Sequence, residues 1–127
     1  LKAPAAAAPK VTILDASGSV VRTLTATNTA GVNRIHWDLR FEPSAQVRLQ
    51  TSPMYAPHIV PGPNGRVAPG TNTLAILAPP GTYTVKLTAG GVEQTQPLVV
   101  RKDPNSGGTD ADIATEASTV VGGAAVL

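Results

Sequence analysis

The chain contains no cysteine, which excludes disulfides, thiolate metal sites and cysteine nucleophiles. Aromatic residues make up only 3% of it, so a core must depend mainly on valine, isoleucine and leucine. No apolar run approaches the roughly 18–20 residues that a membrane span needs. The ten basic residues form no run and do not interleave with aromatic ones, so nucleic acid is not an expected partner.

Recognisable catalytic and metal motifs are also missing. The two histidines, His36 and His58, have no metal-ligand spacing. Asp38 and Glu42 could form a glycosidase pair only if they faced one cleft, and no feature of the sequence places them so. We therefore predict no catalytic residue, cofactor or required metal.

The acidic stretch from Asp103 to Asp112 raises the question of calcium. An EF-hand loop that began at Asp103 would need a closing glutamate where the chain has Ala114, so that motif fails. Turn and helix-cap roles are the preferred interpretation of these aspartates, and a looser calcium site stays open.

The most informative stretch is residues 31–41, which contain the only tryptophan. Ile35, Trp37 and Leu39 alternate with polar residues, a period of two that is typical of a half-buried β-strand. We interpret Trp37 as a core residue and not as an exposed sugar-stacking platform, because its apolar neighbours share its face.

Two hairpins flank this stretch in the sequence. Val11–Asp15 and Val20–Thr25 are predicted strands joined by a turn that contains Gly18. Residues 83–101 form the second, with a turn at Gly90-Gly91, and Pro97 predicts an edge or a bulge in its return strand.

The rest of the chain is expected to be irregular. Residues 1–10 are predicted to be an Ala/Pro linker and residues 105–127 a tail, with a short helix from Thr109 that Gly122-Gly123 would stop near Val121. Seven prolines and four glycines interrupt residues 53–81, so we predict an insertion over 42–81 with at most short strands at 46–51 and 73–77.

These elements predict an all-β fold, an antiparallel β-sandwich over residues 11–104 with a long Pro/Gly-rich insertion and a short C-terminal helix or tail. The expected core consists of Ile13, Leu24, Ile35, Trp37, Leu39, Tyr83, Val85, Leu87, Leu98 and Val100. The insertion carries too much apolar material for a solvated loop. Its candidate interaction residues are Met54, Tyr55, Ile59, Val60, Leu74, Ile76 and Leu77.

Three stretches in order, ILDASGSVVRTL, AGVNRIHWDLR and APPGTYTVKLTAGGVEQTQPLVVRKDP, together resemble a known module. It is the Ig-like or fibronectin-III-like domain near the C-terminus of bacterial proteins with a BNR-repeat, sortilin-like or sialidase-like, β-propeller. A more distant resemblance is to the Ig-like domain of flagellar hook-capping proteins, which has Trp-Asp-Gly where this chain has Trp37-Asp38-Leu39. The resemblance implies a secreted or periplasmic bacterial accessory domain, and it transfers no catalytic residue.

The expected function is therefore a non-catalytic structural or interaction module within a longer polypeptide. Its expected partners are an upstream domain, such as a propeller, or other copies of the chain. An alternative is a small glycan- or peptide-binding domain that uses loop 53–81 and Tyr55, although glycan binding usually requires more than one exposed aromatic ring.

Overall fold

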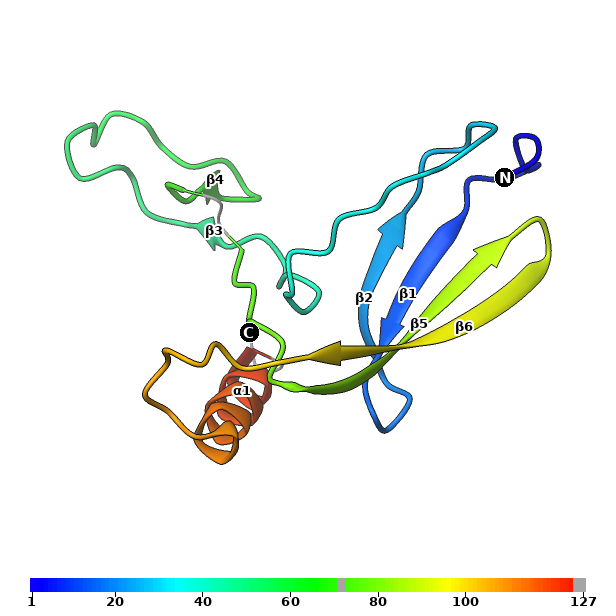
Figure 1. Cartoon of the computed structure of the whole chain (residues 1–127). Helices are drawn as coiled ribbons and strands as arrows, with labels where there is room; N and C mark the ends of the chain where they lie inside the picture. The colour runs from blue at the N-terminus through cyan, green and yellow to red at the C-terminus, as the bar shows by residue number, and fades with distance from the viewer. Residues whose placement is uncertain (71–72, 125–127) are drawn as a thin grey trace. The chain divides into compact units, whose positions relative to one another are not determined.

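The structure is a computed structural model that describes residues 1–70 and 73–124, and it is mostly β with antiparallel sheets and one helix (Figure 1). It divides into two units. We call Leu1–Glu42 with Ile76–Leu127 the sheet unit, and Pro43–Ala75 the insertion unit.

The sheet unit is built on four antiparallel strands in the order β2-β1-β5-β6. These are β1 (Lys10–Leu14), β2 (Val20–Thr25), β5 (Gly81–Ala89) and β6 (Val92–Val100). β1 pairs with β2 and β5 pairs with β6, so both hairpins predicted from the sequence are confirmed. β1 also pairs with β5, which brings the two hairpins into one sheet.

The turn between β1 and β2 is organised by Asp15. Its carboxylate accepts hydrogen bonds from the backbone N–H groups of Ser17 (2.8 Å) and Ser19 (2.9 Å), and Gly18 takes the positive φ of 86° that the turn requires. The hydroxyl of Ser17, with these two amides, holds the pKa of the Asp15 carboxyl below its usual value.

β6 lies at one edge of the sheet, as Pro97 predicted. Proline has no N–H to donate, and it fits an edge strand where that position faces away from the ladder. Because Pro97 interrupts the row of donors on the outer side, the edge is a poor template for another strand.

The core lies on one face of this sheet. Val11, Ile13, Val21, Ala78 and Tyr83 form its buried cluster. The partly buried side chains packed against it are Leu24, Ile35, Trp37, Phe41, Val85, Leu87, Leu98 and Val100. Trp37 and Tyr83 meet edge-on, with ring centroids 5.7 Å apart, a favourable geometry for two aromatic rings.

The predicted strand around Trp37 is wrong in detail. Residues 31–39 contain no strand, and the only bridge nearby joins Arg40 to Leu77. The segment nevertheless packs Ile35 and Trp37 against the core, so its alternating pattern reports burial on one face and not a hydrogen-bonded ladder.

Leu39 is a second correction, because it is 43% exposed and not a core residue. It is the non-glycine residue with positive φ among those described, at 56°. Asp38 accepts a hydrogen bond from the N–H of Arg40 (3.1 Å), while the Trp37 indole N–H donates to the Arg40 carbonyl (2.9 Å). This tight turn breaks the alternation and directs Leu39 away from the face of Trp37.

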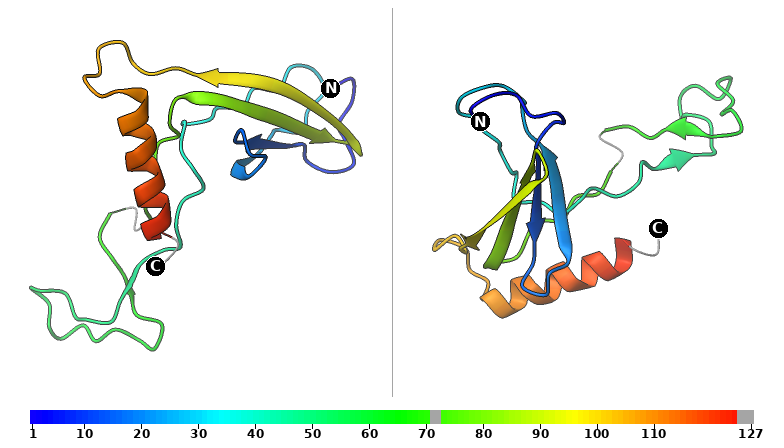
Figure 2. Two further views of the ribbon diagram at one scale, coloured as in Figure 1. Left: turned by 90° about the horizontal axis from the view of Figure 1, so that it is seen from below. Right: turned by 90° about the vertical axis from the view of Figure 1, so that its right-hand side faces the viewer.

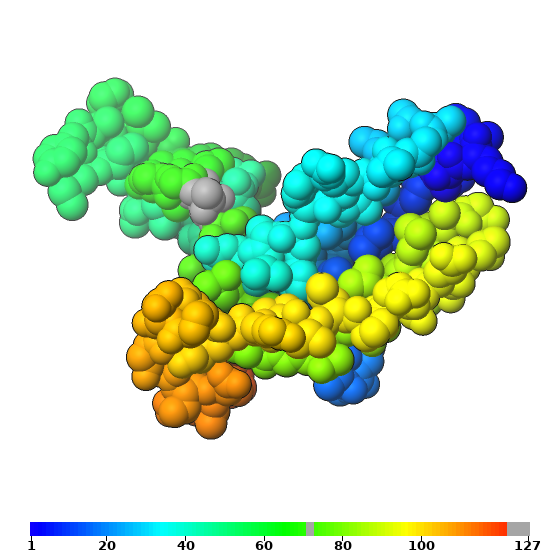
Figure 3. All heavy atoms as spheres, viewed as in Figure 1, coloured from blue at the N-terminus to red at the C-terminus, as the bar shows by residue number. Residues whose placement is uncertain are grey.

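The N-terminal Ala/Pro stretch is held against residues 26–31, as Figure 3 shows in dark and light blue. Leu1 and Gly31 exchange two backbone hydrogen bonds of 2.9 and 2.8 Å. The side chain of Asn28 both donates to and accepts from the backbone of Ala5, at 2.7 Å each. Residues 1–9 and 26–31 are therefore hydrogen-bonded to each other beyond the ends of β1 and β2, without forming regular strands.

Helix α1 (Asp110–Ala124) follows β6 through the loop at 101–109 (Figure 2). Thr109 and Asp112 form the predicted capping box: the Thr109 hydroxyl donates to the Asp112 carboxylate (2.6 Å) and accepts from the Asp112 N–H (3.2 Å). The predicted stop at Gly122-Gly123 is wrong, because the helix continues to Ala124. A glycine costs a helix about 1 kcal/mol relative to alanine, which lowers helix stability without ending the helix.

The insertion unit contains two short strands, β3 (Arg48–Leu49) and β4 (Arg66–Val67), paired antiparallel. β3 falls inside the strand expected at 46–51, β4 was not anticipated, and the strand expected at 73–77 is absent from the described residues there.

Candidate interaction surface

Hydrogen bonds close the insertion unit at its two ends. The Ser44 N–H donates to the Leu74 carbonyl (2.8 Å), and the Leu74 N–H donates to the Ser44 hydroxyl (2.9 Å). In the sheet unit, Phe41 N–H donates to Ile76 carbonyl (2.8 Å) and Ala78 N–H to Leu39 carbonyl (2.7 Å). In each unit, the two chain segments next to the unit boundary are thus hydrogen-bonded to each other.

Proline determines the turns inside the insertion unit. A hydrogen bond from Ile59 to Ala56 (3.0 Å) closes a turn with Pro57 at its second position, and one from Gly65 to Gly62 (2.9 Å) closes a turn with Pro63 there. Proline favours this position because its ring presets φ near −65°. The prolines therefore order this stretch locally and do not leave it without structure.

A third turn presents two large side chains to solvent. Ala56 N–H donates to the Pro53 carbonyl (3.1 Å), which places Met54 and Tyr55 at the two central positions. Side chains at these positions point away from the closing hydrogen bond, and accordingly Met54 is 84% and Tyr55 94% exposed.

Gly65 and Arg66 connect the last turn to the β3–β4 ladder. Gly65 has φ of 68°, and a Cβ there would lie 2.9 Å from the Leu49 carbonyl oxygen, so the position requires glycine. The Arg66 guanidinium Nε–H donates to the Thr51 carbonyl (2.6 Å).

The insertion unit has no buried residue among those described, 43–70 and 73–75. Of the predicted interaction residues, five that lie in it are more than a third exposed, namely Met54, Tyr55, Ile59, Val60 and Leu74. Val47 and Val67 are exposed in the same unit. The two remaining predicted residues, Ile76 and Leu77, belong to the sheet unit, where Leu77 is exposed and Ile76 half-buried. We call the exposed apolar side chains of the insertion unit the apolar surface.

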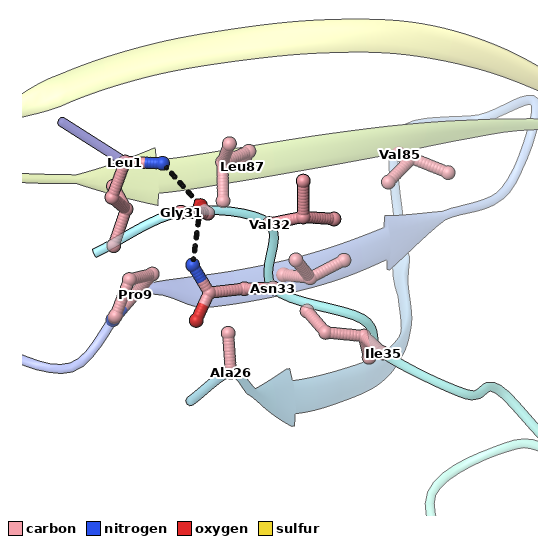
Figure 4. Close-up of a pocket in the computed structure, with 10 residues that line it drawn as sticks. Leu1, Pro9, Ala26, Gly31, Val32, Asn33, Ile35, Val85 and Leu87 are labelled. Atoms are coloured by element: carbon pink, nitrogen blue, oxygen red, sulfur yellow. Dashed lines mark hydrogen bonds between the residues drawn. The ribbon is translucent and has the colours of Figure 1, made fainter. Parts of the chain in front are cut away.

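A separate apolar pocket of about 490 Å³ lies in the sheet unit (Figure 4). Val11, Val85 and Leu87 form its floor on β1 and β5, with Ile35 beside them. The polar side chain in its lining, Asn33, is occupied by hydrogen bonds with Thr29. The other lining side chains are apolar, and the amino group of Leu1 donates to the Gly31 carbonyl (2.9 Å), so the pocket is mainly a gap in the apolar cover of the core.

The acidic residues considered for chemistry have hydrogen-bond partners in the backbone. The Asp38 carboxylate accepts from Arg40, whereas the Glu42 carboxylate accepts from the backbone N–H of Thr23 (3.2 Å) on β2. The Asp103 carboxylate accepts from Asn105 N–H (2.9 Å). Within residues 1–70 and 73–124, His, Asp and Glu side chains form no group of three that could hold a metal ion.

The titratable group with an altered pKa inside the core is Tyr83. Burial raises the pKa of its phenol, with a smaller contribution from the negative charge of Asp15, and the hydroxyl donates to the Pro79 carbonyl (2.6 Å). This hydrogen bond and the edge contact with Trp37 hold the Tyr83 ring in the core.

No helix in the described part of the chain is long and apolar enough to cross a membrane. No protein-family model, curated protein or solved structure matches the chain. The candidate site that the described residues support is the apolar surface of the insertion unit, with its ordered turns and exposed side chains.

Proposed function

We propose that this chain is a non-catalytic structural and interaction module of a larger secreted bacterial protein, and that its insertion unit packs on a neighbouring domain or subunit. The observation that carries the proposal is a unit with ordered turns, several exposed apolar side chains and no buried residue among those described. Exposed apolar side chains mark an interaction surface where they form one contiguous patch, and several large ones within a single short unit support that proposal here.

The Ig-like or fibronectin-III-like identity of the sheet unit is part of the same proposal. Its two hairpins and Trp37 come in the order that the resemblance implies. Leu39 adds support, because the hook-capping domains have glycine at this point and the positive φ of Leu39 favours glycine.

Glycan binding is the less favoured alternative, because a glycan platform needs stacked aromatic faces. Tyr55 is exposed, whereas Trp37, Phe41 and Tyr83 belong to the core or pack against it. An affinity gel that retards the chain, and releases it on Tyr55→Ser substitution, would favour this alternative instead.

Hydrogen exchange tests the proposal. We would compare residues 43–75 in the dilute chain, in the concentrated chain, and in the longer polypeptide that contains it. We expect slower exchange of the insertion unit in at least one assembled form, with β5 unchanged as the internal control. Equal and rapid exchange in all three samples would contradict the proposal, as would sialidase or peptidase turnover that Asp38→Asn abolishes.

A further inference from the structure

The charges of the chain are sorted by segment. The insertion unit contains Arg48 and Arg66 and no aspartate or glutamate. From Asp103 to the C-terminus the chain contains the opposite, four carboxylates and no lysine or arginine. All eight acidic residues lie outside the insertion unit.

Within the described residues, neither segment is neutralised by an internal ion pair. An ion pair joins Lys86 on β5 to Glu93 on β6 (2.8 Å), and both residues lie outside the two segments. Among the described residues of its own unit, no charged side chain of either segment forms an ion pair, so these charges can take part in a contact with a partner.

Both segments also present apolar side chains. On α1, Asp112, Glu116 and Val120 follow one another at intervals of four and share one face of the helix. Val120 is exposed, as is the neighbouring Val121, while Ala117 is buried. The insertion unit exposes Met54, Tyr55 and Val60 and also contains the two arginines.

We infer that the insertion unit of one copy docks on the acidic face of α1 of a second copy. This inference rests on the proposed function and names the partner. Two insertion units repel each other by charge, as do two α1 helices, so the favoured contact joins unlike segments. If the insertion unit of each copy binds α1 of the other, the two copies form a closed dimer with two equivalent contacts.

The apolar surface and the charges have different tasks in this contact. Burial of side chains such as Tyr55 supplies the free energy, since most interface energy comes from a few large side chains. The charges select the partner and speed the encounter, and their contribution decreases with salt.

Charge reversal provides the test, measured by sedimentation velocity on the whole chain. Arg48→Glu and Glu116→Lys each place like charges across both contacts of a dimer. An equimolar mixture of the two variants again places opposite charges across both. We expect each variant alone to dissociate about tenfold more readily than wild type, and the mixture to regain dimers. We also expect wild-type dimers to weaken about tenfold between roughly 50 and 500 mM salt.

Lys2→Glu serves as the matched control, because it changes the net charge as Arg48→Glu does but lies outside both segments. It should associate as wild type does. Circular dichroism of each variant checks that it is folded.

A chain that stays monomeric at every concentration would overturn the inference, and so would folded variants whose mixture gains no dimers. The outcome is separable from that of the proposed function. If the insertion unit is protected only in the longer polypeptide and concentration has no effect, the proposed function stands and the second copy is wrong.

Discussion

Leu39 offers a test in which glycine should be better than alanine. In most strands and helices, replacing alanine by glycine costs roughly 0.5–1 kcal/mol, because glycine loses more backbone freedom on folding. Leu39 has φ of 56°, in the left-handed region, where a residue with a Cβ costs roughly 1–2 kcal/mol. The second effect exceeds the first.

The two variants Leu39→Ala and Leu39→Gly lose the same contacts of the leucine side chain, so their comparison isolates the effect of the backbone. From the figures above, Leu39→Gly should be more stable than Leu39→Ala by about 0.5–1 kcal/mol. Leu39 is 43% exposed, so part of its side chain is covered by the protein. Loss of that contact should make both variants less stable than wild type by about 1 kcal/mol or more. In Leu39→Gly the relief of backbone strain offsets part of this loss.

Val99 is the control position. Val99 is an exposed residue of β6 without a positive φ. We therefore expect Val99→Ala to be more stable than Val99→Gly. At each position we take the change in the free energy of unfolding from the alanine to the glycine variant. These changes should differ between positions 39 and 99 by the cost of placing a residue with a Cβ in the left-handed region, about 1–2 kcal/mol.

Urea unfolding followed by the fluorescence of the single tryptophan, Trp37, measures all four variants. Trp37 packs against Tyr83 and reports directly on the core. If Leu39→Ala is more stable than Leu39→Gly by the same margin as at Val99, the turn at Asp38–Arg40 is not as described and the reasoning is refuted.

Gly65→Ala should disrupt the β3–β4 ladder at a cost of at least about 1 kcal/mol. The reason is that residue 65 has a positive φ and that the added Cβ would contact the Leu49 carbonyl oxygen. Unchanged chemical shifts of the backbone amides in the ladder would contradict this. The hydrogen bond from the Thr109 hydroxyl lowers the pKa of the Asp112 carboxyl. The ionised carboxylate therefore stabilises α1 above the usual carboxyl pKa, and this stabilisation is lost as pH falls below about 4. Helical ellipticity should therefore decrease with acid more steeply in wild type than in Asp112→Asn, and parallel curves would exclude the contribution. Pro97→Thr restores a donor to the outer side of β6 and should increase association detected by light scattering, whereas an equally monodisperse variant would show that the edge is protected otherwise.

Local patterns predicted the regular elements well. The alternation in residues 11–25 and 83–101 depends only on neighbours along the chain, and it identified both hairpins of the sheet. The Thr109–Asp112 capping box is equally local, since its two residues lie three positions apart. Proline at residue 97 predicted an edge or a bulge, because a regular central position would leave a ladder bond unmade, and the structure has the edge.

The alternation at Ile35 and Trp37 was informative about burial but not about pairing. A period of two requires an extended backbone with one apolar face, and an extended segment can pack on a sheet without joining its ladder. The left-handed turn at Leu39 left no sign in the sequence, because leucine is not a residue that such turns select.

The sequence by itself determined an antiparallel β protein, the position of its hairpins, the start of its helix and the apolar character of its insertion. Tertiary structure alone decided which partners distant residues found: Asn28 with Ala5, Ser44 with Leu74, and Glu42 with Thr23. It also decided that the apolar side chains of the insertion unit stay exposed. Propensity and period act over a few residues, whereas burial depends on which surfaces the whole chain brings together.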